Sequence, residues 1–213
     1  SLNLDYVYQV DHMVQPGETL PSEDRKVFCG GKGLNQSIAL ARAGAQVYHA
    51  GLIGPEGGIL INILKESKVN VELVDQIEEA TGHAMIQVDP NGQNCILIYG
   101  GANSKIDKAM VDRVLAEFEA GDILVLQNEI SELNYIIDKA YEKKMKIVLN
   151  PSPWSESLAQ IDPAKITLYI CNEIEAQAMT GQCEPKGILQ AMRGRQLVLT
   201  MGEDGAWYQS NKG

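Results

Sequence analysis

Apolar and polar positions form a regular, alternating pattern in the second half of the chain. Segments with apolar residues three and four positions apart, typical of amphipathic helices, alternate with short apolar runs typical of strands buried on both faces. The pattern predicts helices over 106–118, 131–143, 173–180 and 186–192, and strands over 123–126, 147–149, 167–170 and 197–200. This alternation predicts an α/β fold, with a mainly parallel sheet flanked by helices.

The first half of the chain shows a different pattern. Apolar and polar residues alternate over 4–10, which predicts a strand with one buried face. Alternation over 84–88 and a second apolar run around 96–98 flank the turn sequence of residues 89–92, Asp-Pro-Asn-Gly. These segments predict a β-hairpin that the N-terminal strand joins in a small sheet.

Such a sheet is expected to act as a lid on the main fold. The sequence thus predicts one α/β domain spanning 1–213, with lid segments of about 4–28 and 82–102 inserted into it. Within the first lid segment, the mixed charges around Asp24 and Arg25 predict a solvated loop.

A glycine-rich turn with one lysine, Gly30-Gly31-Lys32-Gly33, runs directly into an amphipathic helix. Glycines let backbone N–H groups approach a ligand closely, and Lys32 and Asn35 supply further donors. The spacing differs from both common nucleotide-binding loops, G-x-x-x-x-G-K-[ST] and G-x-G-x-x-G. The segment therefore predicts a site for a polar ligand of another kind.

Composition narrows the class of partner. The 213 residues are 45% hydrophobic and 22% charged, and the net charge is −10 with no run of lysine or arginine, which argues against binding to nucleic acid or to an anionic membrane. The four cysteines lack C-x-x-C spacing and the three histidines are scattered, so neither a zinc site nor a disulfide framework is predicted. We expect a cytoplasmic protein with a small-molecule partner.

Polar residues follow four of the predicted strands in the second half. They are Gln127-Asn128-Glu129, Asn150, Asn172-Glu173-Ile174-Glu175 and Thr200-Met201-Gly202. Each group alone is typical of helix caps and turns. Because the carboxyl ends of parallel strands meet at one edge of a sheet, their recurrence favours a ligand site there.

The sequence of residues 30–41, followed by Ala43-Gly44-Ala45, resembles the first signature motif of the ribokinase-like (PfkB-type) carbohydrate kinases. The resemblance extends over nearly the whole chain and implies ATP-dependent phosphorylation of a sugar hydroxyl, with Mg²⁺ as cofactor. Within the family, the G-G-K-G-x-N-Q motif most resembles the ribokinase branch. Kinases for fructose, ketodeoxygluconate or a nucleoside remain alternatives.

The resemblance also assigns roles to single residues. It implies that the sugar is bound by Asn3, Asp5, Gly31, Lys32, Asn35 and Glu129. It implies that the nucleotide is bound by Asn172, Thr200, Gly202 and Gly205. Glu175 is expected to organise Mg²⁺ indirectly, through water, because Mg²⁺ usually keeps several of its waters.

One motif of the family does not occur in residues 1–213. The family's general base is the aspartate of a G-A-G-D motif, expected beyond Gly213 together with the rest of the adenine pocket and a monovalent-cation site. We therefore expect a kinase truncated at both ends, inactive as the fragment alone. The alternative is a naturally short protein that binds a sugar or nucleotide without catalysis. The resemblance further implies a homodimer paired lid to lid.

Overall fold

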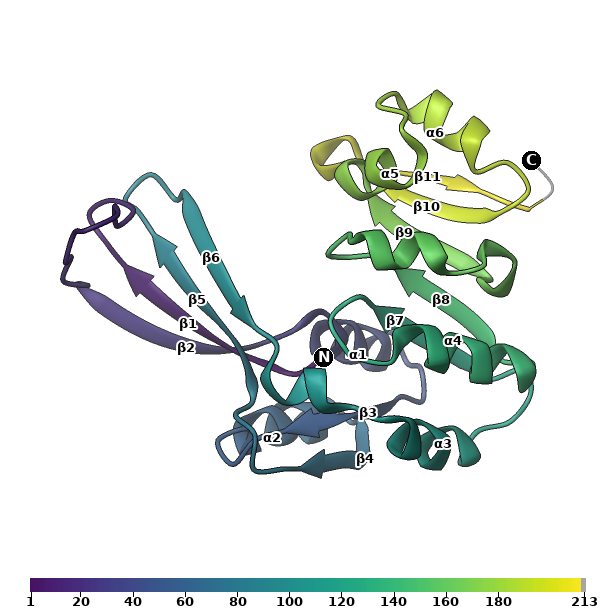
Figure 1. Cartoon of the computed structure of the whole chain (residues 1–213), viewed down its shortest axis with the longest axis horizontal. Helices are drawn as coiled ribbons and strands as arrows, with labels where there is room; N and C mark the ends of the chain where they lie inside the picture. The colour runs from purple at the N-terminus through teal and green to yellow at the C-terminus, as the bar shows by residue number, and fades with distance from the viewer. Residues whose placement is uncertain (212–213) are drawn as a thin grey trace. The chain divides into compact units, whose positions relative to one another are not determined.

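The computed structural model describes residues 1–211 and divides the chain into two compact units, one ending at Ile106 and the other beginning at Asp107 (Figure 1). Each unit has its own sheets and helices. The expectation of a single domain with an inserted lid remains a prediction. No helix within residues 1–211 has both the length and the apolarity needed to cross a membrane.

The first unit contains a four-stranded mixed sheet of order β2-β1-β5-β6. Its strands are β1 (Asn3–Gln9), β2 (Asp24–Gly30), β5 (Gly82–Val88) and β6 (Asn94–Tyr99). Strand β1 runs antiparallel to β2 and parallel to β5, and β5 runs antiparallel to β6. Within this unit the sheet projects away from α1 and α2 (Figure 1). The predicted N-terminal strand and hairpin are confirmed.

The prediction of a solvated loop at Asp24 and Arg25 is wrong. Both residues belong to β2 and pair with Gln9 and Tyr8 of β1. They are exposed because β2 is an edge strand, and charged residues are common at such edges. Their polarity therefore reflects an edge position, not a missing strand.

The rest of the first unit packs around an apolar core. It comprises α1 (Lys32–Arg42), β3 (Tyr48–Ile53), α2 (Gly58–Glu66), β4 (Asn70–Gln76) and the 3₁₀ turn η1 (Gly101–Lys105). Strands β3 and β4 form a separate parallel pair. The buried core consists of Leu2, Leu4, Leu34, Ile38, Ile53, Leu60, Leu64 and Val69. The start of β1 and the helix after the glycine turn thus share one core.

The second unit has the predicted α/β rhythm. Its sheet has the order β11-β10-β9-β8-β7 and consists of β7 (Ile123–Gln127), β8 (Lys146–Asn150), β9 (Leu168–Asn172), β10 (Gln196–Thr200) and β11 (Ala206–Gln209). Strands β7 to β10 are parallel, and β11 runs antiparallel to β10. This confirms a mainly parallel sheet.

Helices in this unit follow their predicted positions closely. They are α3 (Lys108–Ala116), α4 (Leu133–Glu142), α5 (Glu173–Thr180) and α6 (Pro185–Ala191), with the 3₁₀ turns η2 (Glu156–Gln160), η3 (Pro163–Lys165) and η4 (Gly202–Asp204). Helix α3 begins later than predicted because the Asp107 side chain accepts a hydrogen bond from Met110 N at 2.8 Å and so caps the helix.

Candidate functional site

The glycine turn connects β2 to α1 in a conformation that few residues adopt. Gly31 has a φ of 96°, and a side chain there would also bring its Cβ within 2.9 Å of the Ser1 carbonyl oxygen. Ser1 occupies two donors at the helix start: Gly33 N donates to its Oγ and Leu34 N to its carbonyl oxygen, each at 3.0 Å. These occupied N–H groups make the turn a poor phosphate cradle and leave recognition to side chains.

Asp5 extends from β1 over the last residue of β2. A Cβ added to Gly30 would lie 2.7 Å from Asp5 Oδ1 and closer still to Oδ2, so the glycine makes room for this carboxylate. Burial and the Asp5 charge both raise the pKa of the Cys29 thiol, as expected for a carboxylate beside it. The β1–β2 pairing therefore brings a half-buried carboxylate to the glycine turn.

Asn3 lies two residues before Asp5 on the same face of the sheet, and it is buried. Its side-chain oxygen accepts a hydrogen bond from Asn103 Nδ2 at 2.8 Å. Asn103 also bonds both backbone groups of Leu2, receiving from its N–H at 3.0 Å and donating to its carbonyl at 3.1 Å. Asn103 thus fixes the start of β1, and the Asn3 amide group is the part suited to donate to a ligand.

Lys32 and Asn35 complete the polar set of the first unit. Lys32 is the first residue of α1 and is half-buried, while Asn35 is exposed one turn later on the same side of the helix. Five of the six predicted sugar-side residues therefore belong to the β1–β2–α1 arrangement. Glu129 follows β7 in the second unit, so its meeting with the others stays a prediction.

The parallel strands of the second unit end in polar residues, as predicted. Gln127 pairs with Asn150 in register, and Asn172 pairs with Thr200. Asn150 Nδ2 donates to the Ile170 carbonyl of the neighbouring strand at 2.7 Å. The carboxyl edge of β7 to β10 is therefore a continuous polar rim.

Glu175 is held on this rim by a reciprocal cap at the start of α5. Asn172 Oδ1 accepts from Glu175 N at 2.9 Å, and Glu175 Oε2 accepts from Asn172 N at 3.0 Å. Asn150 Nδ2 lies 3.5 Å from the same Oε2 atom. Among residues 1–211 no group of three or more potential ligands (His, Cys, Asp, Glu) is placed to hold a metal. A buried carboxylate with these contacts suits indirect support of a hydrated cation.

The remaining nucleotide-side residues lie in the turn after β10. Thr200 ends the strand and donates from Oγ1 to the Cys171 carbonyl at 3.3 Å. Gly202 opens the η4 turn and Gly205 follows it, and Met201 N closes the turn by donating to the Gly205 carbonyl at 2.8 Å. Thr200 and both glycines are exposed beside Asn172, which suits close approach by a ligand.

Sequence reasoning missed the supporting roles of two residues. Ser1 fills the donors at the α1 start, and Asn150 supports the Glu175 carboxylate. The position of Asn150 after a predicted strand was a usable signal, but its contact with α5 depends on strand order. Ser1 carried no local signal, because its partners lie more than 30 residues away.

The chain is similar to known carbohydrate kinases along its whole length. A family model described as pfkB family carbohydrate kinase matches residues 1–213. The ribokinase of Haemophilus influenzae is 33% identical over 186 residues, which cover 85% of this chain and 60% of that protein. The ribokinase of Bacillus subtilis is 30% identical over 217 residues, which cover 99% of this chain and 72% of that protein.

A solved structure agrees with these sequence relatives. The crystal structure of ribokinase from Cryptococcus neoformans var. grubii serotype A in complex with ADP matches with a TM-score of 0.85 and 26% identity. The match covers 100% of this chain and 75% of that one. The chain thus spans between 60% and 75% of the length of these three relatives.

Proposed function

The chain belongs to the pfkB family of carbohydrate kinases, and from this membership we propose that the protein transfers the γ-phosphoryl group of ATP to a sugar hydroxyl. Ribose is the first candidate substrate, because the curated relatives compared above are ribokinases. Fructose, ketodeoxygluconate and nucleosides are the other candidates. We propose that the protein works in the cytoplasm.

The observation that carries the proposal is the position of the Asp5 carboxylate, which packs against Gly30 at the glycine turn. A carboxylate accepts hydrogen bonds from hydroxyl groups, and Lys32, Asn3 and Asn35 supply donors to the oxygens of the same ligand. Because two of the first α1 N–H groups are occupied by Ser1, an uncharged polyol fits this arrangement better than a phosphate. Glu129 is proposed as a further acceptor for the sugar.

The polar rim of the second unit is proposed as the nucleotide side. Its donors and acceptors include the side chains of Asn172 and Thr200 and the turn that contains Gly202 and Gly205. These groups orient the phosphates so that the sugar hydroxyl attacks in line. Mg²⁺, when bound, spreads the charge of the transferring group, and Glu175 orients water around it.

Proton removal from the attacking hydroxyl is proposed to belong to an aspartate of a G-A-G-D motif beyond Gly213. That motif does not occur in residues 1–213. Reading the frame downstream of Gly213 tests this point directly. A stop codon at that position rejects the kinase proposal for this gene product and favours a binding protein.

A coupled ADP-release assay tests the substrate and the role of Asp5. The protein expressed from its whole reading frame is assayed with ribose, 2-deoxyribose, fructose, ketodeoxygluconate and a nucleoside. Losing one charge-assisted hydrogen bond of about 1.5–3 kcal/mol lowers kcat/KM by roughly tenfold or more. We expect Asp5→Asn to cause this loss for the sugar, with little change in the KM for ATP.

The matched control is Asp24→Asn on the neighbouring strand. Asp24 is exposed and pairs only with Lys26, at 3.5 Å, among the ion pairs described for residues 1–211. This variant removes the same charge and should leave both KM values unchanged. Equal losses for sugar and ATP in Asp5→Asn would remove Asp5 from the sugar site, and no turnover with any compound would reject the kinase proposal.

The homodimer is proposed from exposed apolar residues of the β2-β1-β5-β6 sheet, the proposed lid. Leu97 is 69% exposed, and Met85 on β5 and Val27 on β2, which lie in register with it on the same face of the sheet, are 46% and 40% exposed. Exposed apolar side chains that gather on one face of a sheet are typical of a protein–protein interface. We propose that two copies pair through this sheet.

A further inference from the structure

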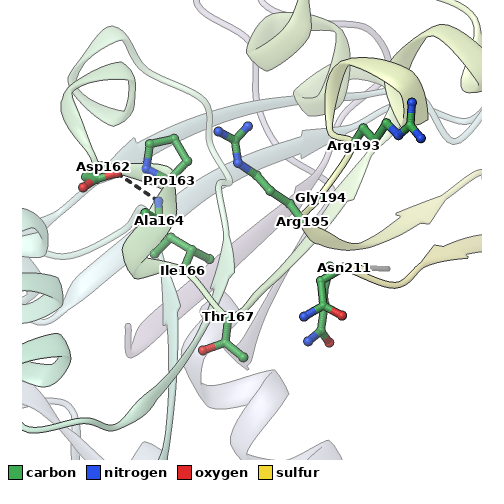
Figure 2. A pocket seen from close by; sticks show the side chains of 10 residues that line it. Asp162, Pro163, Ala164, Ile166, Thr167, Arg193, Gly194, Arg195 and Asn211 are labelled. Atoms are coloured by element: carbon green, nitrogen blue, oxygen red, sulfur yellow. Dashed lines mark hydrogen bonds between the residues drawn. The ribbon is translucent and has the colours of Figure 1, made fainter. Parts of the chain in front are cut away.

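A hollow of about 450 Å³ lies at the amino-terminal edge of the second unit's sheet. It is bounded by the η3 turn on one side and by the turn from α6 to β10 on the other (Figure 2). Pro163 and Ile166 give it an apolar part, while Thr167, Arg193, Arg195 and Asn211 give it a polar part. Its volume is within the range typical of small-molecule sites.

The two arginines set the charge of the hollow. Arg195 is half-buried and reaches toward Pro163, whereas Arg193 is exposed and projects from the other side of Gly194 (Figure 2). Within residues 1–211 neither guanidinium has a hydrogen bond or an ion pair. In a chain of net charge −10, two guanidinium groups that lack a hydrogen bond and an ion pair within the described residues can bind an external anion.

The lining also contains one carboxylate, that of Asp162. Its Oδ1 accepts a hydrogen bond from Ala164 N at 2.9 Å and so caps the η3 turn. This structural use does not neutralise Arg195, since the two side chains form no ion pair within the described residues. The hollow therefore keeps a net positive charge.

Two neutral donors accompany the arginines. Thr167 Oγ1 accepts a hydrogen bond from Ile147 N at 3.0 Å, so its hydroxyl proton is available for a ligand. Asn211 contributes a carboxamide to the lining. Together with two guanidinium groups, these donors outnumber what a carboxylate can accept and suit the three terminal oxygens of a phosphate monoester.

The hollow is separate from the polar rim described above. Thr167 directly precedes β9 and Asn172 ends it, so five residue steps of about 3.3 Å place the hollow about 16 Å from the rim. No residue of the proposed sugar or nucleotide sets lines it. A ligand here would bind at the opposite edge of the sheet.

We propose that this hollow binds a small phosphate monoester. Arg195 is the principal contact to the phosphate, and Arg193 supports it from the outer edge of the hollow. Thr167 and Asn211 add hydrogen bonds. The apolar part formed by Pro163 and Ile166 receives the carbon portion of the ligand. The proposal uses other residues than the proposed kinase activity and stands independently of it.

Titration with inorganic phosphate, followed by amide TROSY spectra of the protein from its whole reading frame, tests this site. Ionic strength is held constant with sodium chloride, and sodium acetate is titrated in parallel. We expect saturable shifts at Gly194 and Thr167. Arg195→Gln should raise the dissociation constant about tenfold or more, and Arg193→Gln should raise it less.

Two further variants keep the result interpretable. Arg195→Lys retains the charge without the planar fork and should bind with intermediate strength. Arg42→Gln, at the exposed end of α1, removes the same charge far along the chain and should change nothing. Absence of saturable shifts, an unchanged constant in Arg195→Gln, or an equal loss in Arg42→Gln would overturn the site. Acetate binding as tight as phosphate would overturn the phosphate assignment.

Discussion

Replacing Asn103 with alanine should destabilise the first unit and leave the second unchanged. The Asn103 side chain is 2% exposed and makes three hydrogen bonds of 2.8, 3.0 and 3.1 Å to Leu2 and Asn3. Leu2 is fully buried and Asn3 is 6% exposed, so water compensates little for the lost contacts. Truncation therefore leaves one donor and two acceptors buried without their partner.

The structure sets the size of the effect. Each hydrogen bond contributes a net stabilisation of about 1 kcal/mol, so the loss of three of them lowers the free energy of unfolding by about 3 kcal/mol. Buried groups left unsatisfied add to this value. A loss of about 3 kcal/mol raises the population of the opened first unit by roughly 150-fold, which is large against a typical domain stability of about 5–15 kcal/mol.

Native-state hydrogen exchange measures this loss for each unit separately. Amides of β1 and β5 should exchange faster in Asn103→Ala, while those of β8 and β10 keep their rates. Asn94→Ala is the control, because Asn94 is exposed on β6, and it should change stability by less than about 0.5 kcal/mol. A loss below about 1 kcal/mol in Asn103→Ala, or equal losses in the two units, would refute the reasoning.

Three further outcomes are expected. In Gly30→Ala the new Cβ displaces the Asp5 carboxylate, so kcat/KM for the sugar should fall about tenfold or more in the coupled assay, and an unchanged value would contradict the contact. Burial raises the pKa of the Cys171 thiol to about 12, so at pH 8 a maleimide should label exposed Cys95 and spare Cys171 until the protein unfolds, as peptide mass mapping would show. Leu97→Glu should convert the proposed dimer to a monomer in sedimentation velocity, and a monomeric wild type would reject that dimer.

The sequence predicted most of the second unit because its signals are local. Helix α5 has its predicted bounds, since Asn172 caps its start and Gly181 ends it in a left-handed conformation with φ of 71°. The polar ends of β7 to β10 were also predicted, because apolar runs of this length show where buried strands stop.

Elements of the first unit were harder to predict. Helix α2 begins at the pair Gly57-Gly58, which gives no start signal, and β3 contains Gly51 within a mixed burial pattern. Strand β6 carries the apolar run of residues 96–99 yet is exposed throughout. Its apolarity alone did not reveal that it lies at a sheet edge.

The sequence by itself determined the apolar periodicity of the strands and helices, the glycine turn and the signature motif of the family. Each of these depends on residues close together in the chain. Only the tertiary structure decided that Asn103 holds β1 across 101 residues, that Ser1 fills the donors at the start of α1, and that Asn150 lies beside Glu175. These contacts depend on which strands become neighbours in a sheet. Strand order is set by burial of the common core, and a local pattern of apolar and polar residues does not encode it.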